Sequence, residues 1–150
     1  MEDDDWYSPN HIETSVKYLL NNKATGDNNL NYHNVKYRCY RQMKNLGSAL
    51  CQTSFRRSEA DKMKNAAQKA IKNKNYSIDG YFWSQFNNKH IMTHQERTVV
   101  GIKGLDDKGL GLGHRINAKW KPDPYLKELT KWIGNDAFVY AQYLDDTITT

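Results

Sequence analysis

The strongest constraint on the fold is a strict alternation of side-chain types between residues 110 and 120. Every second residue faces the same way there, and these positions are Leu110, Leu112, His114, Ile116, Ala118 and Trp120. A period of two is typical of a half-buried β-strand. A shorter alternation over residues 98–103 precedes it, and the turn-forming residues 106–109 lie between the two. Residues 97–120 are therefore predicted to form a β-hairpin, which excludes an all-helical fold.

Other segments have the apolar spacing of amphipathic helices. The first begins at Ser8-Pro9, with Ser8 as N-cap and Pro9 in the first turn. The apolar stripe of this first helix is Ile12, Val16, Leu19 and Leu20. The stripe of the second predicted helix is Tyr32, Val35, Cys39, Met43, Leu46 and Leu50. The third predicted helix starts at Ser58, and its stripe is Ala60, Met63, Ala67, Ala70 and Ile71. A last helix is predicted after the cap Asp123 and Pro124, with the stripe Leu126, Leu129, Ile133, Ala137, Tyr140 and Leu144.

These elements predict an α+β domain that is mainly helical, with three N-terminal helices, one β-hairpin and a C-terminal helix. The aromatic segment 76–86 fits either a short strand or a packed turn. Three helices followed by a hairpin is also the element order of winged-helix domains, so that fold is one expectation. We expect a single domain over residues 1–150, with a flexible acidic N-terminus at 1–7 and a flexible tail at 145–150.

Size and composition limit the class of protein. The chain has 150 residues, including ten Tyr, four Trp and four Phe, which is too aromatic for a wholly disordered chain. No apolar run reaches the roughly 18 residues of a membrane span, and the acidic start lacks the apolar core of a signal peptide. Free thiols are expected for Cys39 and Cys51, which lack the spacing of a redox or zinc motif. A cytoplasmic protein is predicted, or a nuclear one in a eukaryotic host.

Charge is distributed unevenly along the chain. The net charge of +5 combines a balance of +9 over residues 36–75 with −4 over residues 1–35, +3 over 76–122 and −3 over 123–150. Such a cluster is typical of a protein that binds phosphates. The predicted contact residues are Lys36, Arg38, Arg41, Lys44, Arg56, Arg57, Lys62, Lys69, Lys72 and Lys74. Tyr37, Arg56 and Arg57 are candidates for base or sugar contacts. The alternative is a solvated helix face without a ligand.

One local motif supports DNA as the partner. Residues 66–83 contain Ala70-Ile71-Lys72-Asn73-Lys74 followed by Gly80-Tyr81-Phe82-Trp83. This segment resembles the short DNA-binding module appended to many phage homing endonucleases, in which a helix ending in a Lys/Asn run leads into a Gly-aromatic close. The resemblance covers less than a fifth of the chain, and no nuclease signature accompanies it. It implies that Lys69, Lys72 and Lys74 meet the DNA backbone while Trp83 packs the module.

Candidate catalytic and metal-binding residues are histidines. Gly111-Leu112-Gly113-His114 on a strand before a helix resembles ββα-metal nucleases, which implies His114 as general base. The later Asn or His metal ligand of that family has no clear counterpart in the last helix, where Asn135 and Asp136 are polar. The alternative for His114 is a partly buried structural side chain. His90 and His94 are spaced to chelate a metal on a helix, or are two surface histidines. No other catalytic constellation is evident, so an enzyme is the less favoured class and no cofactor is predicted.

Three functional hypotheses follow. The first is a small basic DNA- or RNA-binding protein, an accessory or regulatory factor of viral or mobile-element type, that contacts phosphates through residues 36–75. The second is a protein-interaction module, such as an inhibitor of a host enzyme or a structural subunit, because acidic ends and a basic middle suit docking or self-association into a homo-oligomer. The third is a metal-dependent nuclease that uses His114.

Overall fold

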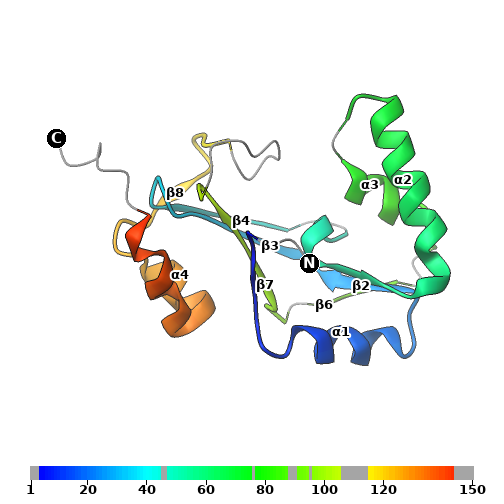
Figure 1. Cartoon of the computed structure of the whole chain (residues 1–150), viewed down its shortest axis with the longest axis horizontal. Coiled ribbons are helices and arrows are strands. Elements are labelled where there is room, and N and C mark those ends of the chain that lie inside the picture. Colours follow the sequence, from blue (N-terminus) through cyan, green and yellow to red (C-terminus); the bar gives the residue numbers. More distant parts are fainter. Residues whose placement is uncertain are drawn as a thin grey trace. The chain divides into compact units, whose positions relative to one another are not determined.

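The computed structural model describes residues 4–44, 47–75, 77–87, 91–94, 96–105 and 115–143. Backbone contacts group the chain into two compact units. Unit 1 comprises Met1–Ser8, Leu30–Met43 and Val99–Thr150, and unit 2 comprises Pro9–Asn29 and Lys44–Thr98. Each unit has its own sheet, and the two are described separately (Figure 1).

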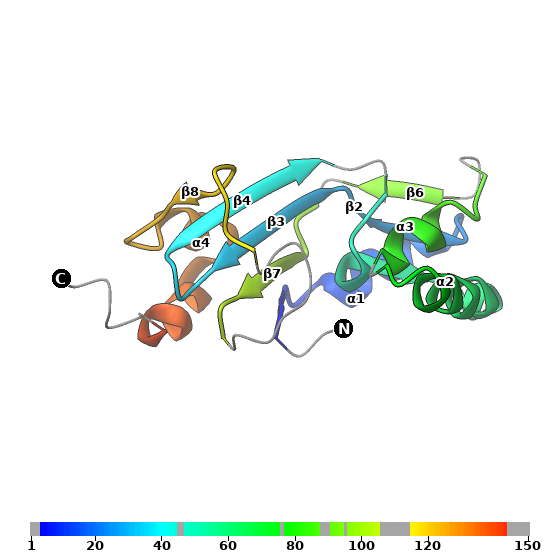
Figure 2. The ribbon, with the colours of Figure 1, turned by 90° about the horizontal axis from the view of Figure 1, so that it is seen from above.

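Unit 1 is built on a five-stranded mixed sheet. Its strands, in spatial order, are β1 (Trp6–Tyr7), β7 (Val99–Lys103), β3 (Asn29–Asn34), β4 (Cys39–Lys44) and β8 (Lys121–Pro122). β7 runs antiparallel to β1 and parallel to β3, and β8 runs antiparallel to β4. Figure 2 shows β3 and β4 side by side as consecutive strands of this sheet.

The apolar core of unit 1 lies between this sheet and the C-terminal helices. These are α4 (Lys127–Ile133) and a 3₁₀ helix over Gly134–Gln142. The buried residues of the cluster are Val35, Val100, Ile102, Leu126, Leu129, Trp132, Ile133 and Ala137. Full burial of one large apolar side chain stabilises a fold by about 1.5–3 kcal/mol, so this cluster is the main source of stability in unit 1.

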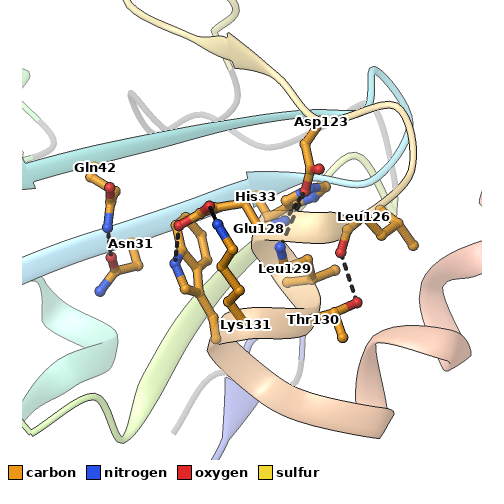
Figure 3. A network of polar contacts seen from close by, with 10 residues as sticks. Asn31, His33, Gln42, Asp123, Leu126, Glu128, Leu129, Thr130 and Lys131 are labelled. Atoms are coloured by element: carbon orange, nitrogen blue, oxygen red, sulfur yellow. Dashed lines mark hydrogen bonds and ion pairs between the residues drawn. The ribbon is translucent and has the colours of Figure 1, made fainter.

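A buried histidine–carboxylate contact joins β3 to the start of α4 (Figure 3). His33 Nε2 lies 3.1 Å from Asp123 Oδ2, and the same oxygen accepts the backbone N–H groups of Glu128 and Leu129 at 3.0 and 3.1 Å. The sequence prediction that Asp123 caps this helix is thus confirmed, although the helix begins at Lys127 rather than at Pro124. Burial lowers the pKa of His33, so the ring is neutral and donates its Nε2–H.

Residues near the N-terminus belong to the unit 1 sheet. Trp6–Tyr7 form β1, and the buried Asp5 carboxylate accepts hydrogen bonds from Lys103 Nζ at 2.8 Å and from the N–H of Ile102 at 3.0 Å. The flexible segment expected at residues 1–7 is therefore not found for residues 4–7. Strand β1 could not be predicted from the sequence pattern, because a strand of two residues has no measurable periodicity.

Unit 2 is built on a small sheet with β2 (Ala24–Asp27) at its centre. β5 (Thr53–Phe55) pairs antiparallel with it and β6 (Ile91–His94) pairs parallel. The helices are α1 (His11–Leu19), α2 (Ala60–Lys72) and α3 (Ile78–Trp83). One face of the sheet carries Ala24, which packs with Ala66, Phe82 and Trp83 in an aromatic core.

The mainly helical fold with one hairpin is wrong. The chain is α+β, but the segment from Tyr32 to Leu50, predicted as the second helix, overlaps strands β3 at 29–34 and β4 at 39–44. Of the stripe predicted for that helix, Tyr32 lies in β3, Val35 in the turn at 35–38, and Cys39 and Met43 in β4, so these residues do not share a helix face. Arg38 in the turn has a left-handed backbone (φ +48°). Without that helix, the winged-helix order is also lost.

The predicted hairpin at residues 97–120 is wrong as well. β7 forms as expected, but it pairs with β1 and β3, and all five of its residues are buried rather than alternating. Residues 106–114 lie outside the described residues, and residues 115–119 are not a strand.

Helix α1 exists but turns the opposite face to the sheet from the one predicted. Ile12, Val16 and Leu20 are 59%, 54% and 69% exposed, whereas His11, Thr14 and Ser15 are buried. Helices α2 and α4 fall close to their predicted positions, and the predicted stripe residues Leu126, Leu129, Ile133 and Ala137 are buried. In the part of the chain that the structure describes, no helix has the length and apolar character to cross a membrane.

Candidate nucleic-acid interface

Helices α2 and α3 of unit 2 pack closely as a helical hairpin, because α2 has small residues on the face that contacts α3. Ala66 and Ala70 are buried there, which lets α3 approach closely. The helix ends in a Schellman motif, in which the N–H of Asn75 donates to the carbonyl of Ala70 at 2.9 Å and that of Lys74 to Ile71 at 3.1 Å. Lys74 occupies the left-handed position of this motif (φ +49°), where glycine is the usual residue.

Trp83 fixes α3 on the rest of unit 2. Its indole N–H donates to the carbonyl of Ser48 at 2.9 Å, and its ring lies against Gly47, where a Cβ would come within 2.7 Å of the indole. Phe82 is fully buried beside it, with the two rings edge to face. The sequence resemblance implied that Trp83 packs this module, and its burial agrees with that role.

A lysine and an aromatic ring lie side by side on the hairpin. Lys69 Nζ is 4.8 Å from the centre of the Tyr81 ring, a cation–π distance, and Asn73 Nδ2 donates to the Tyr81 hydroxyl at 3.0 Å. Lys72 and Lys74 are exposed next to them in sequence. We call Lys69, Lys72, Asn73, Lys74 and Tyr81 the lysine surface.

The lysine surface lies in a stretch of the chain with few acidic residues. Residues 62–78 contain five Lys and no Asp or Glu, and the acids that flank this stretch are Asp61 and Asp79. The first turn of α2 differs, because Glu59 pairs with Lys62 at 3.1 Å and with Lys23 at 3.9 Å, and the hydrogen bond from Lys62 lowers the pKa of Glu59. Positive potential is therefore concentrated at the C-terminal half of α2. One or two lysines there would be enough to complement the helix dipole, so the remaining charge suits an external anion.

The predicted contact residues are divided between the two units, because residues 36–75 run through both. Lys36, Arg38 and Arg41 belong to unit 1, and Lys44 is the last residue of β4. Arg38 is buried, and its Nη2 donates to the carbonyl of Ala141 at 2.7 Å, so this guanidinium has a structural contact. Lys36 and Arg41 are half-buried and Lys44 is exposed.

Arg56 is committed to the end of α1. Its Nε and Nη2 donate to the carbonyl of Leu19 at 2.9 and 2.7 Å, and Nη2 also donates to Leu20 at 2.7 Å. These bonds satisfy carbonyls that a helix end leaves open. Arg57 is exposed beside it and starts the 3₁₀ turn Arg57–Glu59.

The histidine candidates separate in the structure. His114 and His90 lie outside the described residues. His94 is the last residue of strand β6, so the helical spacing assumed for a His90–His94 chelate does not apply. Its buried ring stacks on Tyr18, with 4.8 Å between ring centres. Within the described ranges, no three His, Cys, Asp or Glu side chains are grouped so that they could hold a metal ion.

A layer of buried polar side chains lies between α1 and the sheet of unit 2. The Ser54 hydroxyl donates to that of Ser15 at 3.0 Å, and His11 Nδ1 lies 3.0 Å from the Thr98 hydroxyl. Burial lowers the pKa of both His11 and His94 and raises that of Asp27 to about 6. His11, Thr14, Ser15, Thr25, Asp27, His94 and Thr98 are at most 7% exposed, and Ser54 is half-buried, so most of the layer is closed to a substrate.

Tyr81 is the member of the lysine surface that the sequence patterns did not single out. The sequence did offer one signal: only a few residues separate the lysine-rich helix from the aromatic segment. The break at residues 73–75 turns the chain back on α2, which brings the two together. The polar layer was missed because its histidines and threonines were not counted as core residues.

Searches of protein-family models, curated proteins and solved structures found no match to the chain. Functional inference therefore depends on the geometry described above.

Proposed function

We propose that this protein binds nucleic acid through the lysine surface of the α2–α3 hairpin. The observation that carries the proposal is the placement of Lys69 over the Tyr81 ring, with Asn73 bonded to the Tyr81 hydroxyl. Lysines bind phosphates. Tyr81 is half-buried against the aromatic core of unit 2, so its part in the proposal is to position Lys69 through the cation–π contact. Both DNA and RNA have phosphates, so the proposal covers either polymer.

The geometry also narrows the earlier set of contact residues. Lys69, Lys72 and Lys74 are retained, together with the exposed Arg57. Arg38 and Arg56 are left out of the set of contact residues, because their guanidinium groups donate hydrogen bonds to backbone carbonyls and have a structural role. Lys62 is a weaker contributor, since its ammonium group pairs with Glu59.

The test is binding of labelled dT20 and rU20 oligonucleotides, followed by fluorescence anisotropy at several salt concentrations. The double variant Lys69→Glu/Lys72→Glu should lower affinity at least tenfold and reduce the slope of log K against log salt, because two phosphate contacts are lost. Lys127→Glu is the control, since Lys127 is an exposed lysine of unit 1. Equal affinity of the double variant and the control, with both folded by circular dichroism, would refute the proposal.

A second candidate is a protein-interaction module, and α1 favours it. Ile12, Val16 and Leu20 form an exposed apolar stripe at helical spacing, which is the pattern of a helix that packs against another helix. The simplest occupant is α1 of a second copy. Sedimentation would then show a dimer that Val16→Asp dissociates and Glu13→Gln does not.

A further inference from the structure

Unit 1 has an open pocket next to the paired ends of β4 and β8. It has a volume of about 460 Å³, and its lining residues are Tyr37, Cys39, Ile116, Asn117, Trp120 and Pro122. The strands hold the two sides of the pocket together, because Cys39 pairs with Pro122 and Tyr40 with Lys121. A pocket of this size is in the range that takes a small organic molecule.

The walls of the pocket suit a flat ring. The Tyr37 ring is 49% exposed, while the Trp120 indole is buried and its N–H already donates to the carbonyl of Arg115 at 3.0 Å. Burial raises the pKa of Cys39 to about 11, so this side chain is a neutral thiol and adds an apolar surface. Asn117 brings an amide to an otherwise apolar lining.

The segments that form the pocket carry only positive charge. Residues 36–41 and 115–122 contain Lys36, Arg38, Arg41, Arg115, Lys119 and Lys121, and no Asp or Glu. Arg115 and Lys119 are exposed and adjoin the lining residues Ile116 and Trp120 in sequence, and Lys36 Nζ lies 5.8 Å from the centre of the Tyr37 ring. Lys121 lies 6.0 Å from the ring of its strand partner Tyr40, on the other side of the sheet from Cys39 and Pro122. Asp123, the next acid along the chain, is buried against His33. The pocket therefore combines an aromatic lining with a cationic border.

We infer that this pocket binds a nucleotide, with the base against Tyr37 and Trp120 and the phosphate near the exposed Arg115 and Lys119. An aromatic wall binds the face of a base, and lysine and arginine bind its phosphate. The ligand is either a free mononucleotide or one nucleotide of a single strand. The site is separate in sequence from the lysine surface and belongs to the other unit.

The deciding variant is Tyr37→Ala, with Tyr125→Ala as its matched control. Tyr125 is another exposed tyrosine of unit 1, with Lys127 Nζ 5.7 Å from its ring, but it does not line the pocket. The probes are dTMP and AMP, measured by calorimetry, and fluorescein-labelled dT8, measured by anisotropy. Tyr37→Ala should weaken binding at least fivefold, Tyr37→Phe less than twofold because it keeps the ring, and Tyr125→Ala less than twofold.

The pattern over the probes identifies the source of the ligand. Loss of dTMP or AMP binding indicates a free nucleotide, and loss of dT8 binding alone indicates a strand. No binding of any probe, or equal affinity of Tyr37→Ala and Tyr125→Ala for all three, would overturn the inference. If Tyr37→Ala fails to fold, a Tyr37→Leu variant with affinity equal to that of Tyr37→Phe would overturn it in the same way.

Nucleotide binding by the pocket can be tested separately from nucleic-acid binding by the lysine surface. Lys69→Glu/Lys72→Glu should leave mononucleotide affinity unchanged, because these residues are in unit 2. A Tyr37 effect without a lysine effect would support the pocket and refute the proposed function, and the reverse result would do the opposite.

Discussion

The two faces of the small sheet in unit 2 are covered by opposite kinds of side chain. Ala24 and its strand partner Phe55 face an aromatic core, in which Phe55 and Phe82 lie 5.1 Å apart. Thr25 and its partner Ser54 face the other way, towards the polar layer under α1. One face is stabilised by buried apolar area, whereas the other buries hydroxyl groups, histidines and the carboxyl group of Asp27. The packing on the apolar face should therefore contribute a stability that does not change with pH, whereas the stability from the polar face should depend on pH.

The largest effect is expected from removing the centre of the aromatic face. Phe82 is fully buried, so Phe82→Ala should lower the free energy of unfolding by about 3–5 kcal/mol, through lost burial and a cavity. Urea denaturation at pH 7 and at pH 6 measures this, and the loss should be the same at both values. Phe138→Ala is the control, because Phe138 is 72% exposed. A loss below 1 kcal/mol would show that this face is not the apolar support of the sheet.

The next effect is a gain in stability on the polar face. Burial raises the pKa of Asp27 to about 6, above its unfolded value of about 3.9, so the charged form is disfavoured by folding. The free-energy cost of burying the ionised carboxylate is fully present above pH 6 and absent below about pH 4. Asp27→Asn keeps an acceptor for the N–H of Asn29 and should raise the free energy of unfolding at pH 7 by roughly 1–3 kcal/mol.

Denaturation of the Asp27→Asn variant at pH 7 and pH 4 tests this sign, with the exposed Asp61→Asn as control. A destabilised Asp27→Asn protein at pH 7 would mean that the carboxylate is held by a favourable charge interaction instead.

A smaller effect comes from the two histidines of the polar layer. Their pKa values are lowered by burial, so the unfolded chain takes up protons first as pH falls below about 6.5. Stability should therefore drop on going from pH 7 to pH 6, by roughly 1 kcal/mol for the pair. Asp27 acts in the opposite direction over this interval, so the measurement belongs in the Asp27→Asn background. An additional His94→Gln substitution should reduce the drop, and an unchanged drop would assign it to other groups.

The smallest effect is at the end of α2. Lys74→Gly should stabilise the fold by about 0.5–1 kcal/mol, because glycine adopts the left-handed conformation without strain. If Lys74 contacts phosphate, the same change should weaken dT20 binding two- to threefold. Lys74→Ala removes the charge but keeps the strained conformation, so it should weaken binding equally without stabilising. Thermal melts and anisotropy separate the two terms, and a glycine variant with undiminished affinity would remove Lys74 from the lysine surface.

The sequence was a good guide where apolar residues form the core. The positions of Leu126, Leu129, Ile133 and Ala137 in the C-terminal helix were predicted because they pack against an apolar sheet face. The lysine-rich stretch was correctly predicted to be helical, but its predicted apolar stripe was largely wrong: Ala70 is buried, whereas Ala60 and Ile71 are exposed.

The sequence was a poor guide where polar residues are buried. In α1 the inner positions are His11, Thr14 and Ser15, so counting apolar residues selects the exposed face. Strand β3 has the same property, since Asn31, His33 and Asn34 are all buried. Tyr81 and the pocket at Tyr37 depend on contacts between distant segments, which a single sequence pattern does not specify.

The order in which the chain passes through its two units has a consequence for synthesis. Strand β7 lies between β1 and β3, although it follows β3 by more than sixty residues. Every segment of unit 2 has been made once Thr98 has left the ribosome, whereas the unit 1 sheet still lacks an inner strand at that moment. We therefore expect unit 2 to gain protection first in a growing chain, and unit 1 to close only when residues 99–103 bring strands of high sequence separation together.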